Sequence, residues 1–376
     1  MGSIFVFIAT TCGFVAANFA LAARSAGAGR PTVWLVGLAA FALPQISTLG
    51  MAVRRATGGL RLPWIIDNLG FYLLMASLFL FVFFVVANLA RLTHLTPVWL
   101  TRPREVMLGV ALVVLYLGGG AVNARFARFT EYSLATDKKG VDMTLVLIAD
   151  LHIDNDGISK PRLANVVERV NALTPDVVLL AGDIVDNFSR PFVEGGWAQV
   201  MAKLAPKHGV YAITGNHEFY GEGVDAVVAA VSKDSGITFL RDRSQKVEGL
   251  PLTLVGRDDM GGHGHGRPGG NKPVRALMEG TDPADYRIVM IHRPMGRGGD
   301  MAEFMGDADL AVSGHSHNGQ VFPANIMVKY IYENPWGLLA RGAQAMITTC
   351  GLGLWGPAIR IGSHPEVVVI RVKSRA

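Results

Sequence analysis

The stretch "MTLVLIADLHID", residues 143–154, joins an uncharged apolar run to a polar one, and the fold prediction starts from it. Its first half is rich in aliphatic and β-branched side chains, which predicts a buried strand. Asp150 and His152 follow at the point where this strand should leave its sheet. Ligands of open α/β sheets bind at that carboxyl edge, so the stretch predicts an α/β domain with polar chemistry there.

The chain continues with the same alternation. Leu163, Val166, Val167 and Val170 have helical spacing within Lys160–Leu173, and two more helices are predicted around 196–204 and 224–235. Further strands are predicted in "DVVLLAGD", "GVYAITGN", "ITFLRD", "LTLVGRDD", "YRIVMIHRP", "ADLAVSGHSH", "AQAMITTCG" and "EVVVIRV". Strands that first alternate with helices and then dominate predict an α/β domain of two packed sheets flanked by helices.

The N-terminal third has a different composition. Four uncharged apolar segments cover residues 4–23, 32–53, 69–90 and 106–122. An apolar helix of about 20 residues can cross a bilayer, so we expect four transmembrane helices within residues 1–125. Any one segment could instead be a buried helix of a soluble domain, but four in succession favour the membrane. Residues 126–142 are then expected to be a linker, and residues 143–376 the second domain.

Charge gives a weaker indication of orientation. The arginines at the ends of the spans divide equally between the two sides, and Lys138 and Lys139 favour a cytoplasmic C-terminal domain. We therefore expect a multi-pass protein of the inner (plasma) membrane. The net charge of +5 comes mostly from these arginines and calls for no nucleic-acid partner. The two cysteines, Cys12 and Cys350, are not expected to form a disulfide.

Side chains that can bind metals recur after the predicted strands. In chain order they are Asp150, His152, Asp183, Asn216, His217, Glu218, His292, His315 and His317. Imidazole and carboxylate ligands without thiolates suit manganese, iron, zinc or nickel. So many ligands are too many for one ion and fit two, with the Asp183 carboxylate as the natural bridge.

These residues, in the order D-x-H, G-D, G-N-H-E, H and G-H-x-H, resemble the signature of calcineurin-like metallophosphoesterases from Met143 to about Gln320. The resemblance implies two divalent ions, with manganese favoured. One ion would be held by Asp150, His152, Asp183 and His317, and the other by Asp183, Asn216, His292 and His315. Ser316 and Asn318 depart from the usual closing motif G-H-T-H-G-G-Q, but neither change removes a ligand.

The resemblance also implies roles around the ions. His217 would face the substrate and stabilise the transition state or protonate the leaving oxygen. Apart from the resemblance, Glu218 is expected either to orient His217 from behind or to have a surface or capping role, and Arg293 either to contact a substrate phosphate or to form a surface salt bridge. Asp186 is expected to be a turn residue.

The predicted function is a membrane-embedded dinuclear-metal phosphohydrolase that cleaves a phosphoester or pyrophosphate bond. Because the spans hold the domain at a lipid surface, a lipid-linked substrate is the first hypothesis, and the layout resembles enzymes that hydrolyse UDP-diacylglucosamine. The alternatives are a phosphodiesterase for soluble nucleotides or other phosphodiesters, and a non-catalytic membrane receptor of the same fold. The stretch Gly256–Pro273, with His263 and His265, has a glycine content that favours a mobile lid over an inert insertion or an extra metal site.

Overall fold

The computed structural model describes residues 2–46, 64–153, 157–259, 272–356 and 358–375. The chain forms two compact units, Met1–Gly120 and Ala121–Ala376, and each is considered by itself. Part of the predicted second span and most of the glycine-rich stretch around His263 and His265 lie outside the described residues.

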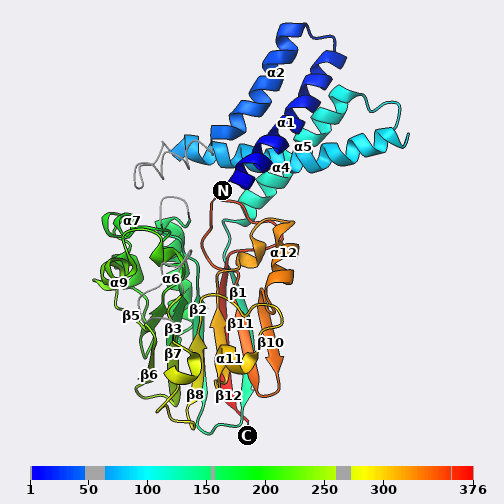
Figure 1. Ribbon diagram of the computed structural model, residues 1–376. Coiled ribbons are helices and arrows are strands. Elements are labelled where there is room, and N and C mark those ends of the chain that lie inside the picture. Colours follow the sequence, from blue (N-terminus) through cyan, green and yellow to red (C-terminus); the bar gives the residue numbers. More distant parts are fainter. Residues whose placement is uncertain (1, 47–63, 154–156, 260–271, 357, 376) are drawn as a thin grey trace. The chain divides into compact units, whose positions relative to one another are not determined.

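The second unit contains two six-stranded sheets (Figure 1). The first sheet has the order β1 (Arg128–Thr136), β12 (Glu366–Ser374), β2 (Asp142–Ile148), β3 (Val177–Ala181), β4 (Val210–Ile213) and β5 (Ile237–Phe239). The second has the order β10 (Gly337–Arg341), β11 (Gln344–Thr348), β9 (Leu310–Ser313), β8 (Tyr286–Met290), β7 (Leu252–Gly256) and β6 (Arg243–Val247). The strands β2 to β5 pair in parallel, as do β7, β8, β9 and β11, so their carboxyl ends share one edge in each sheet.

The main core lies between the two sheets. Leu145 and Leu147 of β2 pack there with residues of the second sheet such as Ile288 and Leu310. Val146 and Ile148, which alternate with them, belong to the core under the outer helices. This period of two is the normal consequence of a strand whose faces are both covered.

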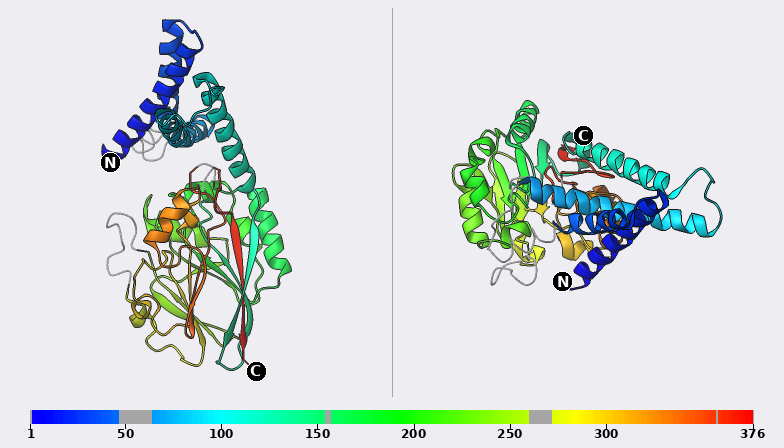
Figure 2. Two further views of the ribbon diagram at one scale, coloured as in Figure 1. Left: turned by 90° about the vertical axis from the view of Figure 1, so that its right-hand side faces the viewer. Right: turned by 90° about the horizontal axis from the view of Figure 1, so that it is seen from above.

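Helices cover the outer faces of both sheets (Figure 2). The first sheet is covered by α6 (Lys160–Ala172), α7 (Arg190–Glu194), α8 (Ala198–Met201) and α9 (Val224–Ser232), and the second by α10 (Val274–Leu277) and α11 (Met301–Met305). The remaining elements are the 3-10 turns η2 (His217–Phe219) and η3 (His317–Gly319) and the helix α12 (Ala324–Ile331). The predicted helix at Lys160–Leu173 is confirmed, and it buries Leu163, Val166, Val167 and Val170.

The predicted two-sheet α/β fold is confirmed, but three strands were not predicted. The stretch 126–142, expected to be a linker, contains β1, which pairs in parallel with β12 from Arg128↔Glu366 to Thr136↔Ser374. The other two are β6 and β10. All three are edge strands, where one side of the strand lacks a partner and polar residues are tolerated. Their sequences therefore lack the continuous apolar run by which the central strands were recognised.

The first unit contains the helices α1 (Gly2–Ser25), α2 (Arg30–Ala42), α4 (Trp64–Leu92) and α5 (Arg102–Asn123) and the 3-10 turn η1 (Leu43–Gln45). Within the described residues, two helical stretches, Tyr72–Leu92 and Arg102–Asn123, are long and apolar enough to cross a membrane. The prediction of four spans is therefore not confirmed. The helix α2 gives way at Leu43 to the turn that contains Pro44, whose ring cannot donate a helical hydrogen bond.

Few residues of the apolar helices in the first unit are fully buried. The buried residues make up 17% and 22% of the most apolar window in Tyr72–Leu92 and Arg102–Asn123. Their polar contacts are made with one another: Asn88 Nδ2 donates to Asn18 Oδ1 at 3.0 Å, and the buried Glu105 pairs with Arg91. Interhelical contacts of this kind satisfy polar groups within an apolar bundle.

Glu366, at the start of β12, ties three parts of the second unit together. Its buried carboxylate accepts hydrogen bonds from Thr130 of β1 at 2.6 Å, from Trp336 Nε1 at 3.1 Å, and from Thr349 Oγ1 and the Cys350 backbone at 3.1 Å each. Burial alone would raise the pKa of Glu366, but hydrogen bonds from His364 and Thr130 lower it to about 2. The carboxylate is therefore ionised and fully satisfied at neutral pH.

Replacing this carboxylate should destabilise the fold. Glu366→Ala leaves several buried donors without an acceptor, so we expect a loss of about 3 kcal/mol and a fall of several degrees in the unfolding midpoint. The measurement is thermal unfolding of the full chain in detergent, followed by tryptophan fluorescence. Glu131→Ala is the control, because it removes an exposed ion pair with Arg371 in the same sheet and should cost less than about 1 kcal/mol. Equal losses in the two variants would contradict the role of Glu366.

Candidate metal centre

The polar residues singled out in the sequence meet at the carboxyl ends of the parallel strands. Asp150 and His152 follow β2, Asp183 follows β3, Asn216 and His217 follow β4, His292 follows β8, and His315 and His317 follow β9. Because β2, β3 and β4 belong to one sheet and β8 and β9 to the other, each sheet supplies part of the site.

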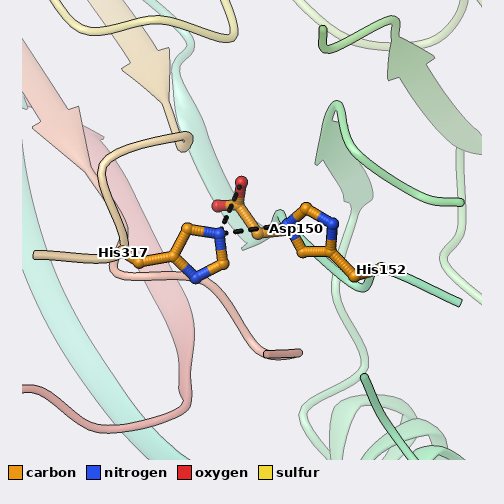
Figure 3. A group of neighbouring side chains, drawn as sticks. All are labelled: Asp150, His152 and His317. Carbon is orange, nitrogen blue, oxygen red and sulfur yellow. Dashed lines mark hydrogen bonds and ion pairs between the residues drawn. The ribbon is translucent and has the colours of Figure 1, made fainter. Parts of the chain in front are cut away.

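One cluster consists of Asp150, His152 and His317 (Figure 3). His152 Nε2 and His317 Nε2 lie 3.0 Å apart, and His317 Nε2 lies 3.6 Å from Asp150 Oδ1. All three residues are buried. Burial and the nearby Arg360 charge lower the pKa of His317 well below its usual value, so its imidazole is neutral, which is the form that binds metals.

A second cluster consists of Asp183, His292 and His315, with Asn216 beside them. His292 Nε2 lies 3.1 Å from Asp183 Oδ2, 3.2 Å from Asn216 Oδ1 and 3.2 Å from His315 Nδ1. His292 Nδ1 lies 2.7 Å from the carbonyl oxygen of Ala181, so it carries the proton and donates it to that oxygen. This contact leaves Nε2 as the nitrogen for a ligand.

The charges of the second cluster favour a cation. Burial would lower the pKa of His292, but the Asp183 carboxylate raises it to about 10. Burial and the His292 charge lower the pKa of His315 to about 3. A negative field strong enough to hold a proton on a buried imidazole also attracts a divalent cation, which competes for the same nitrogen.

Asp183 borders both clusters. Its Oδ2 atom lies 3.1 Å from His292 Nε2 and 3.7 Å from His152 Nε2, while Oδ1 accepts a hydrogen bond from the His217 backbone at 2.9 Å. Burial would raise the pKa of Asp183, but the His292 charge brings it well below its usual value. A single ionised carboxylate therefore lies where a ligand shared by two ions would be needed.

The backbone under these ligands is held in an unusual conformation. Five of the ligand-type residues have a positive φ: Asp150 (54°), His152 (43°), Asp183 (52°), His315 (65°) and His317 (47°). The left-handed region costs a non-glycine residue roughly 1 kcal/mol or more, and such residues gather at functional sites. The concentration of this strain at one edge of the sheets indicates that the surrounding packing fixes the loops.

Two glycines allow these loops to approach the carboxylates. A Cβ atom on Gly215 would lie 2.1 Å from Asp183 Oδ1, and one on Gly314 would lie 2.6 Å from Asp150 Oδ2. Both distances are far inside van der Waals contact. The sequence motifs G-N-H-E and G-H-S-H therefore need their glycines for space.

His217 lies next to the first cluster and is oriented by Asp186. Its Nδ1 atom contacts the Asp186 carbonyl and lies 3.1 Å from Asp186 Oδ1, and its ring packs edge-on against His152 at 4.6 Å between centroids. Asp186 Oδ1 also lies 3.4 Å from His152 Nδ1. The expectation that Asp186 serves only a turn overlooked these two contacts. Burial would lower the pKa of His217, but Asp183 and Asp186 raise it to about 9, so its ring is protonated at neutral pH.

The two remaining candidates, Glu218 and Arg293, belong to neither cluster. Glu218 is buried and accepts backbone hydrogen bonds from Gly215 at 2.7 Å and from Ile184 at 2.7 Å. It holds the loop that carries Asp183, whereas the His217 ring is oriented by Asp186. Arg293 is partly exposed and its Nε atom lies 2.9 Å from Asp259.

Arg360 is a site residue that the sequence did not reveal. It is fully buried, and its guanidinium donates to the carbonyl oxygens of His317 (3.1 Å), Cys350 (2.7 Å), Gly351 (3.1 Å) and Gly353 (2.7 Å). It also donates to Nδ1 of His317 at 3.2 Å. Arg360 therefore joins the loop after β11 to the loop of the two neighbouring histidines. Nothing in the local sequence "AIRIG" distinguishes it from a surface arginine.

A two-sheet α/β domain whose strand ends bring nitrogen and oxygen ligands into two adjoining clusters has the arrangement of a candidate two-metal site. Residues 143–319 match the family model described as calcineurin-like phosphoesterase. The chain therefore contains a calcineurin-like metallophosphoesterase domain, and this domain belongs to the metal-dependent phosphoesterases. The resemblance recognised in the sequence motifs is confirmed.

The relatives include membrane and uncharacterised proteins. A zebrafish (Danio rerio) "transmembrane protein with metallophosphoesterase domain" is 27% identical over 72% of this chain and 63% of its own length. An "uncharacterized metallophosphoesterase" of Aquifex aeolicus is 28% identical over 66% of this chain and 93% of its own. A solved zebrafish dimetal phosphatase gives a TM-score of 0.36 at 14% identity, covering 58% of this chain and 88% of that one. The chain thus spans less than two thirds of the zebrafish membrane relative but nearly all of the Aquifex protein.

The position of Arg360 generates a prediction about metal affinity. Arg360→Lys cannot satisfy all the acceptors that surround the guanidinium, so the His317 loop should loosen. We expect the affinity for Mn²⁺ to fall by about ten- to a hundredfold, measured by titration with detection of free Mn²⁺ by electron paramagnetic resonance. Arg371→Lys, which alters exposed contacts with Glu131 and Thr144 away from both clusters, should bind Mn²⁺ as the original chain does. Unchanged affinity in Arg360→Lys would show that Arg360 serves stability alone.

Proposed function

We propose that this chain is a membrane-associated phosphohydrolase that uses two divalent ions, with manganese favoured, to hydrolyse a phosphoester or pyrophosphate bond. The observation that carries the proposal is the single Asp183 carboxylate that borders two buried ligand clusters. We assign one ion to Asp150, His152, Asp183 and His317, and the other to Asp183, Asn216, His292 and His315.

The chemistry of the donor set fits such a centre. The ligands are imidazole nitrogens, carboxylate oxygens and one amide oxygen, which suit first-row divalent ions. The two aspartates carry fewer charges than two divalent ions, so the loaded site keeps a net positive charge that attracts phosphate. When bound, the ions would polarise the phosphoryl group and lower the pKa of the attacking water.

We assign proton donation to His217. Its Nδ1 atom is engaged by Asp186, so Nε2 is the nitrogen left to donate a proton to the leaving oxygen. The raised pKa of His217 keeps that proton in place at neutral pH. Asp186 holds the ring in position, and Glu218 supports the Asp183 loop behind it. We assign to Arg293 a contact with a phosphate oxygen of the substrate. Its guanidinium is held by an ion pair with Asp259.

The membrane helices support a substrate that resides at a lipid surface. We propose a lipid-linked phosphate or pyrophosphate, with UDP-diacylglucosamine as an example of the class. The apolar helices Tyr72–Leu92 and Arg102–Asn123 and the membrane relative support this location. We retain the four-span arrangement in the inner membrane, with the phosphoesterase domain on the cytoplasmic side, as part of the same proposal.

The shared ligand gives the sharpest test of two-ion hydrolysis. Asp183→Asn removes the charge that both clusters use, so bound Mn²⁺ should fall and hydrolysis of bis-p-nitrophenyl phosphate should drop by about a hundredfold or more. Metal content is measured by elemental analysis of the purified full chain. Asp142→Asn is the control, because Asp142 lies exposed at the opposite end of β2, 3.5 Å from Lys373. Normal turnover in Asp183→Asn would contradict hydrolysis by two ions that share Asp183.

The two neighbouring histidines should separate the two ions. Because His315 belongs to one cluster and His317 to the other, each alanine variant should weaken one ion and leave the other in place. Equilibrium dialysis against Mn²⁺ should then show about one tightly bound ion per chain instead of two. His208→Ala, which lies before β4 and outside both clusters, should retain both ions. Loss of both ions from either site variant would overturn the division of ligands.

A further inference from the structure

The helix α12 (Ala324–Ile331) adjoins the candidate metal centre. It follows η3, the turn that begins at His317, and is capped at its end by Tyr332. The Tyr332 ring packs edge-on against His315, with the centroids 6.1 Å apart. Figure 1 shows α12 at one end of the sheets rather than over either face. Both termini of α12 are therefore connected to the loop that carries the two histidines.

The exposed face of α12 is apolar. Ile326 and Tyr330 lie four positions apart, as do Met327 and Ile331, so the four residues share a helix face, and they are 45%, 71%, 64% and 53% exposed in that order. No residue of the helix is buried. A surface helix normally turns its polar side outward, whereas the exposed residues of α12 are mostly apolar. An apolar face next to a catalytic site is typical of a surface that meets another apolar phase.

Trp355 is a further exposed aromatic residue, and its loop is attached to the site. Its side chain is 61% exposed. Gln320 Nε2 donates to the Trp355 carbonyl at 2.6 Å, and the Trp355 backbone donates to Gln320 Oε1 at 3.0 Å. Two residues earlier, the Gly353 backbone donates to the Asp150 carbonyl at 2.8 Å. The loop of Trp355 is thus fixed to both segments that supply the first ligand cluster.

The charges on this surface match a lipid headgroup layer. Residues 321–332 contain no Asp or Glu, and their only charged residue is Lys329. The Arg297 guanidinium lies 5.6 Å from the Tyr330 ring centroid and donates to the Lys329 carbonyl at 3.1 Å. Exposed Trp and Tyr beside Lys and Arg is the composition that proteins place at the boundary of a bilayer.

We propose that α12 and Trp355 form a docking surface that inserts into the headgroup boundary of a bilayer. The substrate is then a phosphate of a lipid that stays in that bilayer and is reached by the metal centre from its edge. The two apolar helices of the same chain are long enough to cross a bilayer and would anchor the protein to it. This inference rests on the two-ion function proposed above, since docking without a hydrolytic site would have no consequence for the lipid.

The docking itself can be tested without any substrate. Met327→Cys in the full chain is labelled with an environment-sensitive dye and reconstituted in nanodiscs of phosphatidylcholine and phosphatidylglycerol in equal amounts. The native Cys12 and Cys350 are buried and should not react. Lipids that carry a nitroxide near the head of the acyl chain should quench the dye at Met327 strongly. A dye at Lys139→Cys, exposed before β2 at the opposite edge of the sheet, should be quenched little.

Quenching at position 327 no greater than at position 139 would overturn the docking surface. If Met327→Cys chains instead cross-link to one another in nanodiscs that hold two copies, the apolar face is a contact between copies. That outcome also overturns the assignment to lipid.

The substrate class is tested with two diesters that share a leaving group. A diacylglycerol p-nitrophenyl phosphate remains in the nanodisc, whereas bis-p-nitrophenyl phosphate is soluble. In a Met327→Asp, Tyr330→Asp variant, the ratio of lipid to soluble turnover should fall by about tenfold, because charges on the face oppose insertion. An unchanged ratio would overturn the inference. Absence of turnover of both diesters in the original chain would instead refute the two-ion function, so the two failures are distinguishable.

Discussion

A buried carboxylate stays ionised only when positive or hydrogen-bonding neighbours surround it, and Asp183 meets this constraint from several sides. Its oxygens face His292, His152 and the His217 backbone. Glu218, a second buried carboxylate, lies behind the same loop, and burial together with the Asp183 charge raises the pKa of Glu218. Burial also raises the pKa of Asp150. Asp150, Asp183 and Glu218 thus lie in one buried region, and their negative charge would be stabilised by bound cations.

The candidate ligands come from both sheets. The first sheet supplies Asp150, Asp183 and Asn216, and the second supplies His292 and the two histidines after β9. Neither sheet holds a complete cluster, so the site depends on the core between them. The positive φ values at five of the candidate ligands show that the surrounding packing, rather than local backbone preference, sets the conformation of these loops. Arg360 and Glu366 hold the loop after β11, because both form hydrogen bonds with the backbone of Cys350.

The sequence predicts those parts of this arrangement that have a local signal. Central strands such as β2 and β3 are continuous apolar runs, and the candidate ligands follow them directly, so the sequence could predict that these side chains gather at one edge. Edge strands such as β1 have no such run, and they became visible only through their partners. Asp186 and Arg360 were missed for a related reason. Their roles arise from residues far away in the sequence, and a lone aspartate or arginine has no pattern of its own.

The apolar face of α12 affects how the metal centre would meet its substrate. A soluble phosphate approaches an exposed site from any direction, and an apolar rim adds nothing to that encounter. A lipid phosphate is confined to a plane, and its headgroup reaches a buried centre only if the protein surface beside that centre lies in the same plane. Trp355 is hydrogen-bonded to Gln320, which ends the turn that begins at His317. The exposed Trp355 side chain is therefore linked to the first ligand cluster. Insertion of this side chain would therefore set the depth of the ligands relative to the phosphates, which is the requirement for hydrolysis at a membrane surface.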